Sequence, residues 1–109
     1  MAEANAHALY EQVVARFSAH PDVTPPTGGG GFGANGLKVD NRLFAMLTKG
    51  ELVVKLPRQR VDELVASGEG ARFDPGRGRV MKEWLTVPPA DAARWTALAE
   101  EALAFVAGR

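Results

Sequence analysis

Two different spacings of apolar residues indicate where the helices and strands of this chain lie. Near the N-terminus, Leu9, Val13 and Phe17 recur every four residues, so they share one face of a helix that we expect over 2–19. Pro21 should end that helix, because the ring of a proline disfavours helical backbone at the residue before it. A second long helix is predicted near the C-terminus, where apolar residues follow the helical repeat. These residues are Trp95, Leu98, Ala99, Ala102, Leu103 and Val106.

Between the two long helices, a two-residue alternation predicts three strands. In the middle strand, Leu43, Ala45 and Leu47 should point to one face, and Phe44 and Met46 to the other. This strand is apolar on both faces, so we expect it at the centre of a sheet. The flanking strands have their apolar positions at Leu37 and Val39 in the first and at Leu52, Val53, Val54 and Leu56 in the third.

Two tight turns separate these strands, one at Asp40-Asn41 and the other at Lys49-Gly50. Asparagine and glycine tolerate the positive φ angles that two-residue hairpin loops require. The three strands should therefore form an antiparallel meander.

The second half of the chain predicts a short helix, two further strands and the closing helix. Pro57 opens the short helix, because its missing N–H costs nothing at the first helical position, and Gly68 is expected to cap its end. A short strand is expected at 71–73 and a longer one at 80–87, joined by the loop DPGRGR. The buried stripe of the short helix should consist of Val61, Leu64 and Val65.

This order of elements predicts an α+β fold with an antiparallel sheet, α-β(3)-α-β(2)-α, with helices packed on the sheet. The 109 residues suit one domain spanning 1–109, with a proline- and glycine-rich connector at 23–31 inside it.

Composition excludes several classes of function. The 13 basic and 13 acidic residues cancel, so no overall charge favours nucleic acid or an anionic membrane. Cysteine is absent, which excludes disulfides, thiolate nucleophiles and cysteine metal sites. No apolar run approaches the roughly 20 residues of a membrane span, and the N-terminus lacks the pattern of a secretory signal. We therefore expect a soluble cytoplasmic protein without a membrane partner.

The stretch GFGANG, Gly31 to Gly36, matches the G-x-G-x-x-G pattern of dinucleotide-binding loops. Such a loop needs a buried strand before it and a helix directly after it. Here VTPPTGG precedes the stretch, and the alternating LKVDNRLFAML follows it. We therefore predict no nucleotide cofactor, and interpret the glycines as backbone freedom with Phe32 as an anchor into the core.

No residues assemble into a predicted catalytic or metal site. Glu3, His7 and Glu11 are spaced four apart on the first helix, but a solvated surface explains them better than metal binding. Ser18 and Ser67 are the only serines, and neither lies in a nucleophile-elbow pattern. We expect no catalytic residues, no metal and no cofactor.

The candidate interaction surface is basic and lies around the loop that joins the last two strands. Residues 55–82 hold seven basic and four acidic residues, a balance of +3. Arginines in one loop could bind a phosphate or a carboxylate through paired donors. An ordinary solvated hairpin with salt-bridged charges is the favoured interpretation, because a +3 segment attracts anions only weakly. Trp84 should point away from the face of Leu85, where it either covers the second side of the sheet or is partly exposed. It is the best single-residue candidate for a contact. The full candidate set is Arg72, Arg77, Arg79, Lys82 and Trp84.

The chain resembles the TfoX N-terminal domain family and the related small YjbR-like proteins. The residues that carry the resemblance are Phe32-Gly33, Gly36-Leu37, Phe44-Ala45, Leu52 with Lys55, and the loop from Phe73 to Arg79. The resemblance covers about residues 7–107 and implies the same element order, similar to that of type III secretion chaperones. It implies no catalytic residues. Members include regulators of competence genes, which carry a further C-terminal domain, and YjbR-like members have been proposed to bind DNA.

Three functions follow as hypotheses. The leading one is a small non-enzymatic module that binds a protein, or a second copy of itself, through the open sheet face or an edge. Its apolar candidates on that face are Phe44, Met46, Val53 and Trp84. The alternative is a nucleic-acid-binding accessory factor that uses the basic 72–82 hairpin. An enzyme acting on a small molecule is the least favoured, because no cluster of ionisable groups is evident.

Overall fold

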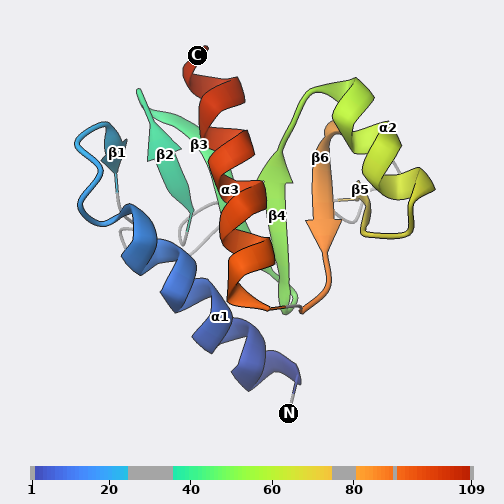
Figure 1. Ribbon diagram of the computed structural model, residues 1–109, viewed down its shortest axis with the longest axis horizontal. Coiled ribbons are helices and arrows are strands. Elements are labelled where there is room, and N and C mark those ends of the chain that lie inside the picture. Colours follow the sequence, from blue (N-terminus) through green and yellow to red (C-terminus); the bar gives the residue numbers. More distant parts are fainter. Residues whose placement is uncertain (1, 25–35, 75–80, 90, 109) are drawn as a thin grey trace.

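The computed structural model describes residues 2–24, 36–74, 81–89 and 91–108 of the chain (Figure 1). Its elements are α1 (Ala2–Phe17), β1 (Val23–Thr24), β2 (Leu37–Val39), β3 (Arg42–Thr48), β4 (Glu51–Lys55), α2 (Arg58–Ala66), β5 (Ala71–Phe73), β6 (Met81–Val87) and α3 (Ala92–Ala107). The predicted α+β fold and its order of helices are confirmed. The additional strand, β1, lies within the proline- and glycine-rich connector predicted at 23–31, and the rest of that connector lies outside the described residues.

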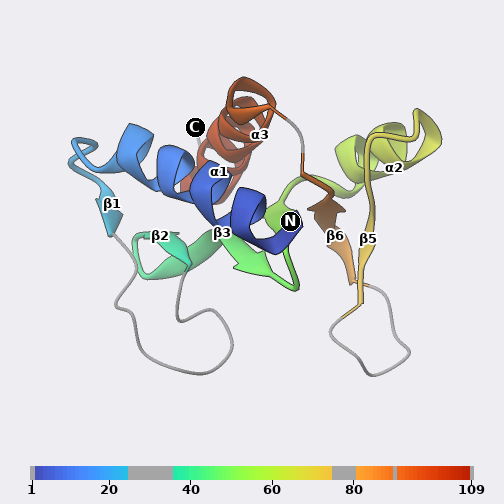
Figure 2. The same cartoon turned by 90° about the horizontal axis from the view of Figure 1, so that it is seen from below.

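The six strands of the described chain form one antiparallel sheet in the order β1-β2-β3-β4-β6-β5. The chain leaves β4 through α2, runs along the edge as β5 and returns as β6 between β4 and β5. The three described helices lie on one face of this sheet, so the domain has two layers (Figure 2). We call the opposite face the helix-free face.

Both predicted hairpin turns have the backbone that their residues favour. Asp40 and Asn41 have φ angles of 52° and 63°, and Lys49 and Gly50 have φ angles of 53° and 77°. Two consecutive positive φ angles are the mark of the type I′ turn, whose twist matches that of the flanking strands. The turns fix the pairing of β2 with β3 and of β3 with β4.

Helix α2 ends as its sequence predicts. Gly68 has a φ of 81° and donates its N–H to the carbonyl of Val65, while the N–H of Glu69 reaches the carbonyl of Leu64. These two bonds form a Schellman motif, in which a left-handed glycine satisfies carbonyls at the helix end. Gly68 thus turns the chain directly towards β5.

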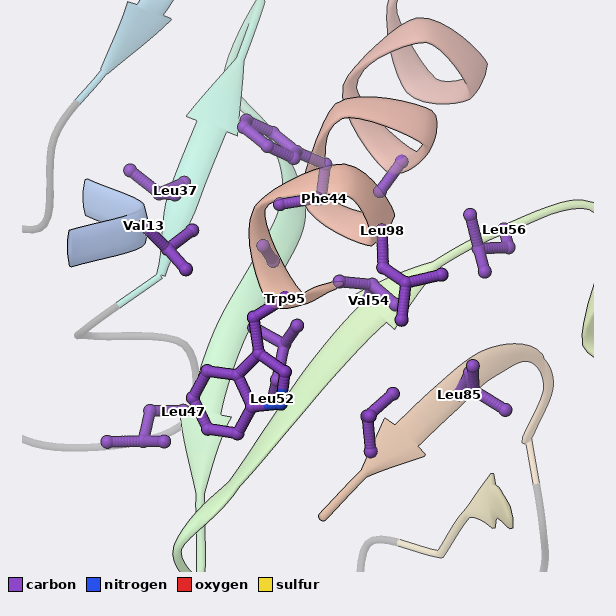
Figure 3. Close-up of a cluster of buried hydrophobic side chains, with 14 of the residues drawn as sticks. Val13, Leu37, Phe44, Leu47, Leu52, Val54, Leu56, Leu85, Trp95 and Leu98 are labelled. Carbon is purple, nitrogen blue, oxygen red and sulfur yellow. The ribbon is translucent and has the colours of Figure 1, made fainter. Parts of the chain in front are cut away.

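The main core lies between the helices and the sheet (Figure 3). Trp95 of α3 is the largest fully buried side chain, and its indole Nε1 donates to the carbonyl of Pro88 at 3.0 Å. Phe17 of α1 meets Phe44 of β3 edge-to-face, with ring centroids 5.7 Å apart. Aromatic pairs favour this geometry. The helical stripes predicted from sequence therefore face the sheet, where they bury Val13 and Leu98 among others.

The sequence prediction that Phe44 lies on the open face of the sheet is wrong, because Phe44 is buried in the main core. Strand β2 pairs Leu37 with Ala45 and then Lys38 with Leu43, so Phe44 is an extra residue in β3. Such a β-bulge interrupts the alternation of side chains between the two faces. As a result Phe44 and Ala45 both join the main core, and Leu43 packs on the other face.

The helix-free face carries its own apolar group, which we call the second cluster. It consists of Met46, Val53, Phe73 and Trp84, with half-buried Leu43 packed against it. Each of the four comes from a different strand, β3 to β6, so the cluster crosses the middle of the sheet and reaches its β5 edge. These side chains are at most 8% exposed.

Gly70, just before β5, has no space for a side chain. A Cβ placed there would lie 2.7 Å from the backbone oxygen of Thr86 and 3.0 Å from Leu85 Cδ1. We expect Gly70→Ala to lower the free energy of unfolding by about 1–3 kcal/mol, because β5 must move away from β6. Urea denaturation of the purified variant measures this effect.

Gly68 provides the matched control two residues earlier. It has a positive φ, but a Cβ added there would meet no other atom within 4 Å, and asparagine tolerates that backbone. Gly68→Asn should cost less than about 1 kcal/mol. Equal losses at the two positions would contradict the close approach of β5 to β6 at Gly70.

Candidate functional site

The candidate residues predicted from sequence do not form one surface. Arg77 and Arg79 lie outside the described residues. Of the remaining three, Arg72 and Trp84 lie on opposite faces of the sheet, and Lys82 is exposed on β6. These residues are close together in the chain, but whether side chains of β5 and β6 share a face depends on how the two strands pair.

Arg72 is engaged within the domain. It pairs with Leu85, whose side chain belongs to the main core, so Arg72 lies on the helix side of β5. Its Nη2 donates to Asp62 Oδ1 of α2 at 2.5 Å. A charge-assisted bond of this kind ties β5 to α2, and it occupies the guanidinium that the sequence predicts to meet a partner.

Trp84 lies on the opposite face from Leu85, as predicted, and it is part of the second cluster. It pairs directly with Lys55 of β4, whose Nζ lies 5.6 Å from the centre of the indole ring. A lysine ammonium at this distance is attracted by the negative face of the ring. The result is a cation placed against the apolar cluster.

Polar side chains surround the second cluster on the helix-free face. Thr86 pairs with Val53, and its Oγ1 donates to Glu51 Oε1 at 2.6 Å. At the β2 side, Lys38 pairs with Leu43 and is half-buried. The helix-free face is therefore an apolar centre with a rim of Lys38, Lys55, Glu51 and Thr86. Sequence reasoning misses this rim, because it depends on which strands pair across the sheet.

The helix side instead carries ion pairs between elements. Arg60 of α2 binds Glu101 of α3 through two bonds, from Nε at 2.9 Å and from Nη2 at 3.2 Å, and it also contacts Glu63. The hydrogen bond with Glu101 raises the pKa of the Arg60 guanidinium further above its usual range, so this arginine stays charged. Arg94 pairs with Glu69, and further along the helix layer Arg16 pairs with Glu100.

No set of metal-ligating side chains gathers in the part of the chain that the structure describes. No three histidine, aspartate or glutamate side chains come together there. His7 and Glu11 are exposed on α1, and the Glu3 side chain is not among those described. No described buried side-chain nitrogen or oxygen lacks a hydrogen-bond partner. On the helix-free face the second cluster is at most 8% exposed, so the accessible side chains around it are those of the half-buried rim.

The glycine stretch is followed by a strand, as predicted. Gly36 leads directly into β2, whereas a dinucleotide loop would lead into a helix whose N–H groups bind the pyrophosphate. The preceding residues Gly31–Asn35, with the predicted anchor Phe32, lie outside the described residues.

Tyr10 is the only tyrosine in the sequence, and it is buried in the main core. Burial raises the pKa of its hydroxyl above the ordinary value of 10.0. Above about pH 10 the unfolded chain loses this proton while the folded chain keeps it, so the free energy of unfolding should fall by up to about 1.4 kcal/mol per pH unit.

We expect tyrosinate absorbance to appear only as the circular dichroism signal of the fold is lost. Tyr10→Phe should lose less stability above about pH 10 than the wild type does, since it retains the ring and lacks the ionisable group. Tyrosinate that forms while the fold is intact would contradict the burial of Tyr10.

No helix in the described ranges is long and apolar enough to cross a membrane. Comparison with known proteins found no matching family model, no matching curated protein and no matching solved structure.

Proposed function

We propose that this chain is a small non-enzymatic accessory module of the TfoX N-terminal-like family, and that it binds a partner protein in the cytoplasm through the helix-free face. The observation that supports this proposal is the division of the apolar residues into two groups. The main core accounts for the packing of the helices on the sheet, whereas the second cluster lies on the opposite face, where its half-buried polar rim is the part that a partner can reach.

The rim of this face indicates the chemistry of the partner. Lys38 and Lys55 flank the second cluster, and in the described structure neither lysine forms an ion pair with a carboxylate. Glu51 is already bonded to Thr86. A partner surface that brings carboxylates to the two lysines would complement the charge of this face and set the orientation of binding.

The alternative is nucleic-acid binding through Arg72, Arg77, Arg79 and Lys82. The geometry supports it less, because Arg72 binds Asp62 and because Trp84, at 8% exposed, presents little ring surface for stacking with a base. Titration with DNA and RNA at low salt tests this alternative. Binding that weakens steeply with salt and is lost in Lys82→Glu would favour it over the protein partner.

The test of protein binding uses charge reversal on two faces. Immobilised wild type, the double variant Lys38→Glu/Lys55→Glu and the control Arg58→Glu are compared for proteins captured from extract of the source cell. Arg58 is an exposed cation at the start of α2, on the helix side. We expect a captured protein whose yield falls at least about tenfold in the double variant and stays unchanged in the control.

Sedimentation velocity of the same three proteins tests a second copy of the chain as the partner. A dimer that is lost only in the double variant would identify the partner as the chain itself. A strictly monomeric protein whose captured proteins are the same in all three forms would contradict the proposal.

A further inference from the structure

Residues 58–73, which comprise α2 and β5, are weakly anchored in the core. Only Val61, Leu64 and Phe73 of this segment are buried, whereas α3 alone buries five residues. Segments with few buried apolar contacts open more readily than the elements around them. We call this stretch the α2–β5 segment.

Ion pairs connect the α2–β5 segment to α3. Arg60 binds Glu101 through two bonds, and Glu69 binds Arg94. The four side chains are 34–44% exposed, so salt in the solvent can screen both pairs. The attachment of α2 to α3 therefore depends on ionic strength. The apolar contacts that α1 and α3 make in the main core depend on it less.

The pairing of β5 with β6 leaves part of β6 without a partner in β5. Ala71, Arg72 and Phe73 pair with Thr86, Leu85 and Met81, so residues 82–84 of β6 have no partner in β5. On its other side β6 pairs with β4 over residues 84–87, and the backbone carbonyl of Glu83 accepts a further bond from the N–H of Leu56 at 3.0 Å. Removal of β5 would leave β6 held in the sheet by β4.

We propose that the α2–β5 segment is a cover over Trp84 and the outer edge of β6, and that ion pairs hold it in place. This cover opens as one unit, while α1, α3 and strands β1, β2, β3, β4 and β6 stay folded. Opening removes Phe73 from the second cluster, exposes Trp84 and frees the outer edge of the seven-residue strand β6. Raised ionic strength shifts this equilibrium towards the open form. This device is independent of the identity of any partner.

Hydrogen exchange of the full chain, measured by mass spectrometry at about 0.05 M and about 1 M sodium chloride, tests the proposal. We expect amides of α2 and β5 to exchange by local opening, faster than those of α3. Their rates should rise about three- to tenfold at the higher salt, and those of α1 and β3 should not. Rates in the segment that equal those of α3 at both salt concentrations would overturn it.

Neighbouring glutamates provide a matched pair of variants. Glu101→Gln removes the carboxylate that binds Arg60, whereas Glu100→Gln removes one that binds Arg16 of α1. Glu101→Gln should accelerate exchange in α2 at low salt and reduce its salt dependence, and Glu100→Gln should leave α2 as in the wild type. Indistinguishable exchange of α2 in the two variants would contradict a cover held by ion pairs. If Glu101→Gln folds poorly, Arg94→Gln tests the same prediction through Glu69.

Discussion

Phe44→Ala is expected to lower the free energy of unfolding by about 3–5 kcal/mol, because it removes a fully buried ring from the main core. The loss includes the edge-to-face contact with Phe17, which joins α1 to the sheet. Simple alternation in β3 would place Phe44 on the other face, so the size of this effect reports on the β-bulge. Urea denaturation followed by circular dichroism measures it.

Leu43→Ala is the control for this prediction. Leu43 is only half-buried and packs at the border of the second cluster, so we expect a loss below about 1.5 kcal/mol. A larger loss for Leu43→Ala than for Phe44→Ala would mean that β3 follows the uninterrupted alternation and that the register with β2 is wrong.

Trp95→Ala is expected to cost about 3–5 kcal/mol as well, since Trp95 is the largest fully buried side chain and lies between α3 and the sheet. Trp95→Phe keeps most of the apolar volume but leaves the carbonyl of Pro88 without its indole donor. It should cost about 1–3 kcal/mol. Circular dichroism is the suitable probe, because both variants change the tryptophan fluorescence.

The ratio of the two losses tests the position of the indole. A loss below about 1 kcal/mol for Trp95→Ala would contradict its burial in the main core. Equal losses for the alanine and phenylalanine variants would mean that the hydrogen bond with Pro88, and little of the ring packing, accounts for the contribution of Trp95.

The parts of the fold that depend on neighbouring residues could be predicted from sequence. The turns at Asp40-Asn41 and Lys49-Gly50 follow from the few residues that accept positive φ. The end of α2 follows from Gly68 for the same reason. The buried stripe of α3 follows from the helical repeat, and all of its predicted members except half-buried Leu103 are buried.

Features that depend on pairing between distant segments could not be predicted. The extra residue at Phe44 is determined by how β2 aligns with β3, and nothing in the order of apolar residues within β3 reveals it. Arg72 is predicted to meet a partner because it is basic and near a loop. Its bond with Asp62 requires β5 to lie beside α2, which the sequence does not specify.

The candidate site illustrates the same limit. The sequence places Lys55 in a strand, in the basic stretch 55–82 and in a family resemblance. Its position against Trp84 arises because β6 inserts between β4 and β5. Of the apolar residues predicted for the open face, Met46, Val53 and Trp84 do lie together there, and Phe44 does not. The helix-free face thus holds three of the four predicted apolar residues, but these are buried, and its accessible rim is defined only by the fold.

Site-specific photocrosslinking in the source cell tests the binding proposal most directly. A photoreactive phenylalanine analogue is placed at position 38, on the rim of the helix-free face, or at position 58, on the helix side. We predict a discrete crosslinked protein from position 38 that is absent from position 58 and disappears when Lys55 is changed to glutamate. The same adducts from both positions, or none from position 38, would contradict the assignment of the helix-free face as the binding surface.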